Sequence, residues 1–274
     1  MKRIFAAVLG LSLTLGLTTG CSSTRRMNVG RTAAALLISD EQEEQLGRQV
    51  KTELEQKEKI KYVEDPAVVE YVRSVSTPLL QAANRDRPGV KWKIHVIDDP
   101  KTVNAFATPG GYLYVYTGLI LAAENEAELA GVMAHEAGHV TGRHSAQALM
   151  LQYGQQALIE AALGKNSGTV SQIAAGLAGT GVGLAFSRSN ETEADDFAAR
   201  YTSAAGYDPR GLATFFQKLA AKEGQVPGVF KWLSTHPPST ERVQHVNDYI
   251  ARNRLSGAEL GVDRLASIKQ RLRK

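Results

Sequence analysis

The sequence lacks the features of several protein classes. One cysteine in 274 residues allows no disulfide within the chain, so the fold depends on its hydrophobic core. The net charge is only +4, and it falls to +2, with 30 basic against 28 acidic residues, once Lys2 and Arg3 are set aside. Such a weak balance excludes a surface for nucleic acid. With 43% apolar and 22% charged residues, the chain is neither disordered nor a polytopic membrane protein.

The first twenty residues are typical of an export signal rather than of a folded element. Two basic residues precede an apolar or small-residue run, 4–17, which is too short to span a bilayer. The run leads to Cys21, which resembles the acylated cysteine of a bacterial lipoprotein. We therefore predict a lipoprotein signal peptide over residues 1–20 and a lipid anchor at Cys21; an ordinary secretory peptide is the alternative. Ser22 resembles the signal for sorting to the outer membrane of a Gram-negative cell.

The rest of the chain predicts a polar tether over residues 21–39 and a single domain over residues 40–274. Apolar periodicity predicts helices beginning at Ser39 and near Pro66, and an almost entirely helical half from Asn125 onward. Three short extended runs between them indicate strands at 91–96, 103–107 and 112–116. The expected fold class is α+β, mostly helical with a small central β-sheet.

A segment rich in glycine and alanine, residues 151–186, contains a long uncharged run. Its many glycine and polar residues make it only weakly apolar. We therefore expect packed helices or a mobile flap near the cleft, rather than insertion into a membrane.

The segment NEAELAGVMAHEAGHVTGRH, residues 125–144, contains the most informative motif. A capping box at its start predicts a helix. On that helix His135 and His139 are four residues apart, so both imidazoles project from one face and can bind Zn²⁺. Zinc lowers the pKa of a bound water to about 7, and Glu136 lies close enough to accept its proton. The motif therefore predicts an active-site HExxH helix with Glu136 as the general base.

A catalytic zinc ion needs a third protein ligand. His144 is one residue too early for the metzincin pattern HExxHxxGxxH, and we exclude it as that ligand. An acidic segment farther along is a better candidate, because Glu191 and Asp195 share a face of a helix that Asn190 can cap. One of these carboxylates can bind the metal while the other accepts the free N–H of a zinc-bound histidine. Glu193 is expected as the capping-box partner of Asn190.

Three motifs occur in the order seen in a known family: NAFA with GGYLYVYTGL, then HEAGH, then ETEAD. They resemble the zinc endopeptidases that include HtpX, the CAAX prenyl endopeptidases, BepA and LoiP. The resemblance extends from about Ser39 to Arg254 and implies a zincin-like metalloprotease fold with one Zn²⁺ per chain. It assigns the third ligand to Glu191 and places Asp195 against a zinc-bound histidine. Without the membrane spans of HtpX, the chain is most similar to the exported lipoprotein members, LoiP among them.

The resemblance also implies how substrates bind and how activity is controlled. A substrate would add as a further β-strand to an exposed sheet edge, whose backbone groups accept any extended peptide. The residues of that edge are Asn104, Ala105, Phe106 and Ala107. In the exported members a histidine matching His236 can occupy the open zinc position as a fourth ligand and keep the enzyme latent; the alternative is a simple turn residue. Arg242 either stabilises the developing oxyanion or pairs with an acidic neighbour.

These expectations combine into a lipid-anchored zinc endopeptidase on the periplasmic side of the outer membrane, cutting unfolded or misassembled envelope proteins. Its partners would be those substrates, the membrane and the outer-membrane assembly machinery. The alternative is a chaperone-like periplasmic lipoprotein that binds outer-membrane proteins, with gated or vestigial proteolysis. The intact set of His135, Glu136, His139 and Glu191 favours the enzyme, because a binding protein needs no carboxylate that activates water.

Overall fold

The computed structural model describes residues 38–179, 181, 183–184, 186–221, 231–237 and 239–273. The predicted signal peptide, Cys21 and nearly all of the predicted tether lie outside the described residues. Within them the predicted α+β class is confirmed, since helices surround one three-stranded sheet. No helix in this part of the chain is both long and apolar enough to cross a membrane.

The elements of the first half follow the predicted order of helices, strands and helices. They are α2 (Asp40–Gln56), α3 (Pro66–Asp86), β1 (Lys93–Ile97), β2 (Ala105–Thr108), β3 (Tyr112–Tyr116), α4 (Thr117–Ala122) and α5 (Glu126–Thr141). The second half is helical wherever it is described as regular structure. Its helices are α6 (His144–Tyr153), α7 (Gln155–Ala162), α8 (Ser167–Ala178), α9 (Arg188–Ala204), α10 (Gly211–Ala221), α11 (Lys231–Thr235), α12 (Thr240–Asn253) and α13 (Val262–Leu272).

Side-chain caps fix where the helices begin. Ser39 caps α2 and Asn125 caps α5, as predicted. For α9 the prediction is wrong, because the N-cap is Ser187 and not Asn190. The Ser187 side chain accepts the Asn190 backbone N–H, and the Asn190 side chain returns to the Ser187 backbone, so the two residues close a capping box one turn earlier.

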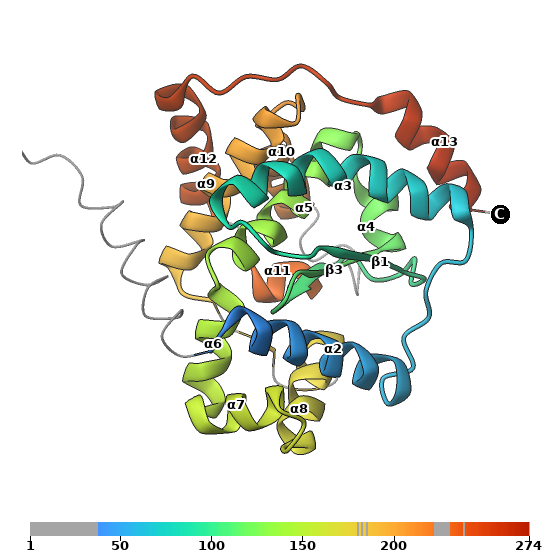
Figure 1. Ribbon diagram of the computed structural model, residues 1–274. Coiled ribbons are helices and arrows are strands. Elements are labelled where there is room, and N and C mark those ends of the chain that lie inside the picture. The colour runs from blue at the N-terminus through green and yellow to red at the C-terminus, as the bar shows by residue number, and fades with distance from the viewer. Residues whose placement is uncertain are drawn as a thin grey trace, which may run out of the picture.

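The sheet has the order β1-β3-β2, with β1 parallel and β2 antiparallel to β3. Side chains alternate across it and divide the core into two parts. One face packs against α3 and α5 through Ala105, Ala107, Leu113 and Val115. The other packs against α2, α7 and α8 through Phe106, Tyr112, Tyr114 and Tyr116. In Figure 1, α3 passes above the sheet and α2 below it, so helices cover both faces.

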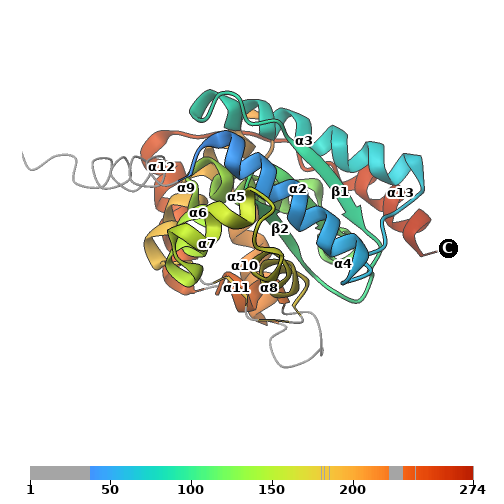
Figure 2. The same ribbon diagram turned by 60° about the horizontal axis from the view of Figure 1, so that its bottom comes forward.

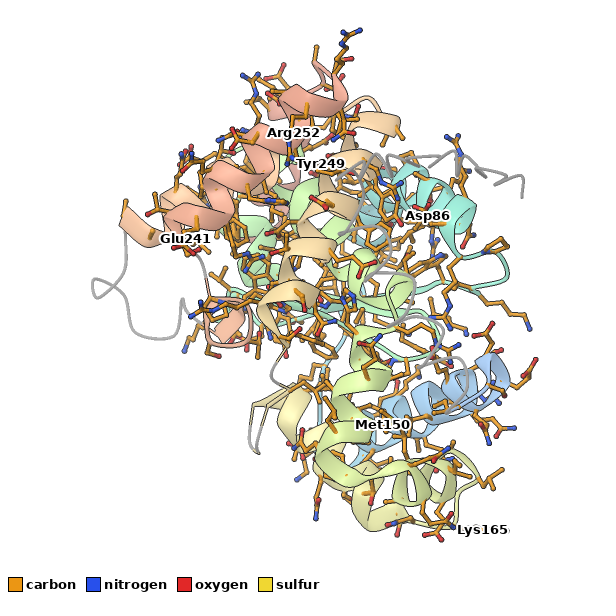
Figure 3. All side chains as sticks on the ribbon, turned by 90° about the vertical axis from the view of Figure 1, so that its left-hand side faces the viewer. Asp86, Met150, Lys165, Glu241, Tyr249 and Arg252 are labelled. Atoms are coloured by element: carbon orange, nitrogen blue, oxygen red, sulfur yellow. The ribbon has the colours of Figure 1, made fainter. Side chains whose placement is uncertain are left out.

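The helices of residues 151–186 form a layer with α2, in agreement with the expected packed helices. Leu158 of α7 and Ile173 of α8 are buried in the same cluster as Leu46 of α2. Figure 2 shows α6, α7 and α8 beside α2. In Figure 3, Met150 and Lys165 mark this end of the molecule, far from α12 and its Glu241, Tyr249 and Arg252. The cluster of α2, α7 and α8 buries part of the weakly apolar segment, whereas Leu151 and Leu163 are exposed.

The HExxH helix α5 lies in the centre, and every residue of it is buried. It packs closely on α9: a Cβ atom added to Gly138 would lie 3.0 Å from Phe197 Cβ and 3.1 Å from the Ala194 carbonyl oxygen. The small residues of the motif therefore admit another helix. This close approach places the face of α9 with Glu191 and Asp195 against the two histidines of α5.

Candidate metal centre

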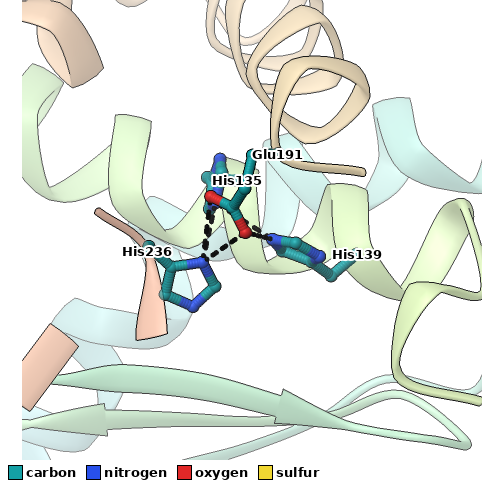
Figure 4. Close-up of side chains that lie close together, drawn as sticks. All are labelled: His135, His139, Glu191 and His236. Atoms are coloured by element: carbon teal, nitrogen blue, oxygen red, sulfur yellow. Dashed lines mark hydrogen bonds and ion pairs between the residues drawn. The ribbon is translucent and has the colours of Figure 1, made fainter. Parts of the chain in front are cut away.

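Four potential metal ligands meet between α5, α9 and the end of α11. His135 and His139 project from α5, Glu191 from the first turn of α9, and His236 follows α11 directly (Figure 4). One nitrogen or oxygen atom of each side chain lies within 4.8 Å of the others, and all four side chains are buried. The fold thus brings together the two predicted histidine ligands, the predicted third ligand and the predicted fourth ligand.

The distances between the donor atoms fit a tetrahedral zinc site. His135 Nε2 lies 3.0 Å from His139 Nε2 and 3.3 Å from His236 Nδ1. The Glu191 carboxylate oxygens lie 3.0 Å from His236 Nδ1, 3.4 Å from His139 Nε2 and 3.5 Å from His135 Nε2. Four ligands about 2.0–2.1 Å from a tetrahedral Zn²⁺ ion are separated by about 3.3 Å. The five separations between the donor atoms, 3.0 to 3.5 Å, are close to that value, so these atoms lie near enough to share one zinc ion.

The protonation of the imidazoles leads to the same conclusion. His135 Nδ1 lies 3.0 Å from Asp195 Oδ1. An ionised carboxylate can only accept a hydrogen bond, so we assign the proton of the neutral imidazole to Nδ1. His135 Nε2 then presents a lone pair to His139 Nε2, whose own Nδ1 faces His144 on the opposite side. Lone pairs directed at one another in a buried site require a cation between them, which is a proton in the metal-free protein and a metal ion that displaces it in the loaded one. Three imidazoles with one carboxylate suit Zn²⁺.

The electrostatic environment keeps the carboxylates of the site ionised. Burial alone would raise the pKa of Glu191, but the imidazoles of His236, His135 and His139 outweigh it and lower that pKa. Burial also opposes ionisation of Asp195, yet hydrogen bonds from Arg242 and His135 lower its pKa. Metal ligation requires a deprotonated carboxylate, so Glu191 is ready to bind a cation at neutral pH.

The histidines differ in their tendency to take up a proton. Burial lowers the pKa of His139 well below the usual histidine value. It opposes the charged form of His135 too, but hydrogen bonding to Asp195 and Glu191 outweighs it and raises the pKa of His135 to about 9. Asp195 thus stabilises positive charge on the imidazole it contacts, as expected for a partner of a metal-bound histidine.

Arg242 holds the acidic side of the site in place. Its Nε and Nη2 donate to the two oxygens of Asp195 at 2.8 and 2.7 Å, a bidentate pair. Its Nη1 lies 2.8 Å from Glu191 Oε2 and donates to the Pro237 carbonyl oxygen at 3.0 Å. Of the two roles that the sequence left open for Arg242, the structure shows the pairing with acidic neighbours.

The predicted general base has a partner that the sequence analysis missed. Trp232 of α11 is buried, and its indole Nε1–H donates to Glu136 Oε1 at 2.8 Å. His236 Nε2 lies 3.5 Å from the same oxygen. Trp232 belongs to no motif. The only signal in the sequence that connects it with this site is its position four residues before His236.

Two further residues have positions that the sequence did not predict. Glu193 is not a capping partner; its Oε2 lies 3.4 Å from His144 Nε2, and both side chains are buried. The reason is that α9 is capped one turn earlier, which frees Glu193 to face α6. His144 is outside the cluster of four ligands, as predicted, but its Nδ1 lies 3.1 Å from His139 Nδ1.

The predicted substrate strand lies beside the metal centre. Asn104 precedes β2, which forms one edge of the described sheet and contacts α5. A cavity of about 570 Å³ reaches Glu191 and Arg242 and is also lined by Phe186 and Pro237. The Phe186 ring is centred 4.1 Å from that of His139, so the end of segment 151–186 does reach the cleft, as one of its two interpretations expected.

Comparison with known proteins agrees with this geometry. Residues 66–250 match peptidase family M48. The chain is 34% identical to metalloprotease LoiP of Escherichia coli over 257 residues, 90% of this chain and 96% of that protein. It is 36% identical over 163 residues to the mitochondrial metalloendopeptidase OMA1 of Schizosaccharomyces pombe, covering 59% of this chain and 47% of that protein. A putative beta-barrel assembly-enhancing protease of Vibrio cholerae is 31% identical over 231 residues, or 75% and 47% of the two chains.

The chain thus spans about half the length of two of these relatives and nearly all of LoiP. The family match covers both the HExxH helix and the helix that carries Glu191. It confirms the resemblance seen in the three sequence motifs. From the metal-binding geometry and the extent of the match together, the chain belongs to peptidase family M48.

Proposed function

We propose that this chain is a zinc-dependent endopeptidase of the bacterial envelope that hydrolyses unfolded or misassembled envelope proteins. The observation that carries the proposal is the position of Glu136, one residue after a zinc ligand and beside a buried cluster of three imidazoles and one carboxylate. Similarity to LoiP and to a putative beta-barrel assembly-enhancing protease supports the envelope as the place of action.

Each residue of the site has its own role in the proposed peptide hydrolysis. When bound, Zn²⁺ polarises the scissile carbonyl and makes water nucleophilic at neutral pH. His135, His139 and Glu191 would hold the ion, and the Asp195 carboxylate, 3.0 Å from His135 Nδ1, would orient that imidazole. The Glu136 carboxylate accepts the proton of the attacking water and then delivers it to the leaving amine.

The sheet edge supplies a binding mode for an extended substrate. Asn104 O accepts the Tyr116 N–H at 3.1 Å and so points to β3, whereas Val103 O points the other way, toward Trp232 N at 3.4 Å. By the two-residue alternation of a strand, the backbone of Ala105 points away from β3 as that of Val103 does. Both residues are buried in this structure, so the predicted edge is covered and not exposed. A substrate strand paired there would pass beside α5. Backbone hydrogen bonds would bind it with little selection among its side chains.

Removal of the metal tests the proposal directly. Incubation of the purified chain with an unfolded protein should yield peptide fragments, and a chelator should stop cleavage because Glu136 has no activated water without zinc. Stoichiometric Zn²⁺ should restore it. Cleavage that continues at the parent rate after verified loss of the metal would contradict zinc dependence.

We further propose that the segment from Trp232 to His236 keeps the resting enzyme latent. His236 Nδ1 occupies the fourth position of the cluster, 3.0 Å from Glu191 Oε1, where a water molecule must bind for hydrolysis. Trp232 donates to Glu136 through its side chain and to Val103 on the substrate edge through its backbone. Residues 232–236 thus contact three parts of the site: the fourth ligand position, the general base Glu136, and Val103, which precedes the predicted substrate strand.

The variant His236→Ala should cut unfolded protein faster than the parent and keep its zinc, because three ligands remain and the fourth position is free. If about 90% of the resting protein is latent, the rate rises about tenfold. The rate of substrate loss and the zinc content per chain measure the two effects.

His245→Ala is the matched control, since His245 of α12 pairs with Asp196 of α9 and is not a member of the cluster. Lost activity with normal zinc in His236→Ala would assign His236 a catalytic contact instead. An unchanged rate would leave it as a turn residue. A parent protein that binds unfolded proteins tightly but cleaves none of them would favour the chaperone-like alternative. The hydrogen bond from Trp232 to the general base Glu136 is consistent with that alternative.

We also propose a lipid anchor at Cys21. A lipoprotein precursor labelled with a fatty acid should carry the label and fractionate with the membrane, whereas Cys21→Ala should lose both properties. Fractionation of both proteins away from the membrane would exclude the anchor.

A further inference from the structure

His144 and Glu193 form a buried pair behind one of the zinc-binding histidines. Only 1% of His144 and 8% of Glu193 is exposed. His144 Nδ1 lies 3.1 Å from His139 Nδ1, and His144 Nε2 lies 3.4 Å from Glu193 Oε2. The three side chains therefore form one line from the metal cluster to α9, although neither His144 nor Glu193 is a ligand.

Hydrogen-bond roles along this line follow from the acceptor at its end. A Glu193 carboxylate can only accept, so His144 carries its proton on Nε2 and leaves Nδ1 as an acceptor. His139 must then donate from its own Nδ1. The tautomer with a proton on Nδ1 leaves His139 Nε2 with its lone pair directed at the ligand atoms of His135 and Glu191.

We propose that His144 and Glu193 are positioning residues that fix the tautomer and the ring orientation of His139 for zinc binding. The inference rests on the proposed zinc-dependent function. Glu193 orients His144, and His144 holds His139. Partners of this kind, beyond the ligands themselves, set metal affinity in zinc sites.

The backbone between α5 and α6 is shaped for this contact. Arg143 adopts the left-handed conformation, with a φ of 59°, and turns the chain so that His144 comes back over the end of α5. Buried Glu43 holds that turn, because the Arg143 Nε donates to Glu43 Oε1 at 2.8 Å. Gly142 makes room for the ring, since a Cβ atom there would overlap the His144 imidazole. An unfavourable backbone held by a buried ion pair marks a position that the fold keeps fixed.

The two histidines of the motif are therefore held by different means. His135 faces the Asp195 carboxylate, which is itself fixed by Arg242. His139 faces a neutral imidazole whose direction depends on Glu193. A change at position 144 or 193 should act on His139 alone and leave the Asp195 and Arg242 pair in place.

The test compares two substitutions of nearly equal shape. In His144→Asn the amide oxygen lies near the position of Nδ1 and can still accept from His139, whereas His144→Leu offers no acceptor. Zinc affinity is measured at 25 °C by competition with a chromophoric chelator. His144→Leu should weaken it about 10- to 100-fold, and His144→Asn should stay within about threefold of the parent.

Two more variants separate positioning from general damage to the fold. Glu193→Leu should weaken zinc binding in the same direction, and Gly142→Ala should do so by displacing the ring without removing any polar group. His245→Leu, an equal substitution at a histidine that is not a member of the ligand cluster, should leave zinc affinity unchanged. The melting temperature of each metal-free protein shows whether it is folded; if His144→Leu is not, the comparison of His144→Asn with Gly142→Ala replaces it.

Zinc affinity as tight in folded His144→Leu or Gly142→Ala as in the parent would overturn the inference, whatever the proteolytic activity. A result in which His144→Asn is as weak as His144→Leu would overturn it too, because the acceptor would then be irrelevant. The proposed function fails separately: a parent with one bound zinc and no cleavage would contradict it, while the differences in zinc affinity could still be measured.

Discussion

Replacement of Glu136 by glutamine should abolish cleavage of unfolded protein and leave the bound zinc unchanged. The amide has the shape of the carboxylate, and its oxygen can still accept the Trp232 indole N–H, which lies 2.8 Å from Glu136 Oε1. It cannot accept a proton from the attacking water. The loss of a general base lowers a rate by about 10²- to 10⁴-fold, so the change is measured as the initial rate at saturating substrate beside the zinc content per chain.

The exposed carboxylate Glu70 on α3 provides the control, since Glu70→Gln removes one negative charge from an exposed ion pair with Arg73. Hydrolysis by Glu136→Gln at the parent rate would remove Glu136 as the base. Equal and negligible hydrolysis by parent and variant, each with one zinc per chain, would instead favour the chaperone-like binding protein.

The parts of the site that could be predicted from sequence are those set by one helix. The spacing of His135 and His139 fixes their common face whatever surrounds the helix, and Asn125 marks where that helix begins. Glu191 and Asp195 share a face for the same reason. Sequence spacing left open which of the two binds the metal; the structure places the Glu191 oxygens among the imidazoles and Asp195 behind His135.

The parts that could not be predicted depend on packing between distant segments. Trp232 reaches Glu136 only because α11 lies against the sheet edge, and a lone tryptophan has no periodicity to reveal this. The sequence predicts Glu193 as a capping partner because it lies three positions after Asn190, the spacing of a capping box. Its contact with His144 depends on a left-handed turn at Arg143, which an arginine does not signal in sequence.

Replacement of Glu191 by alanine should remove most of the bound zinc. The change deletes the carboxylate ligand of the cluster and leaves the Arg242 guanidinium, which lies 2.8 Å from Glu191 Oε2, without that partner beside a divalent cation. Two effects therefore act together: one ligand is lost, and a positive charge nearby is less neutralised. We expect zinc affinity to fall by more than the 10- to 100-fold typical of residues that only contact a ligand.

The zinc content of Glu191→Ala should be compared with that of His236→Ala, because each variant deletes one of the four potential ligands. If Glu191 is a permanent ligand and His236 a displaceable one, zinc is lost in Glu191→Ala and retained in His236→Ala. Thr192→Ala, at the next position of α9, controls for damage to the helix start, since its hydroxyl donates to the Arg188 carbonyl oxygen. Full zinc occupancy in Glu191→Ala would mean that His135, His139 and His236 form the permanent site, and the latent state would then need another explanation.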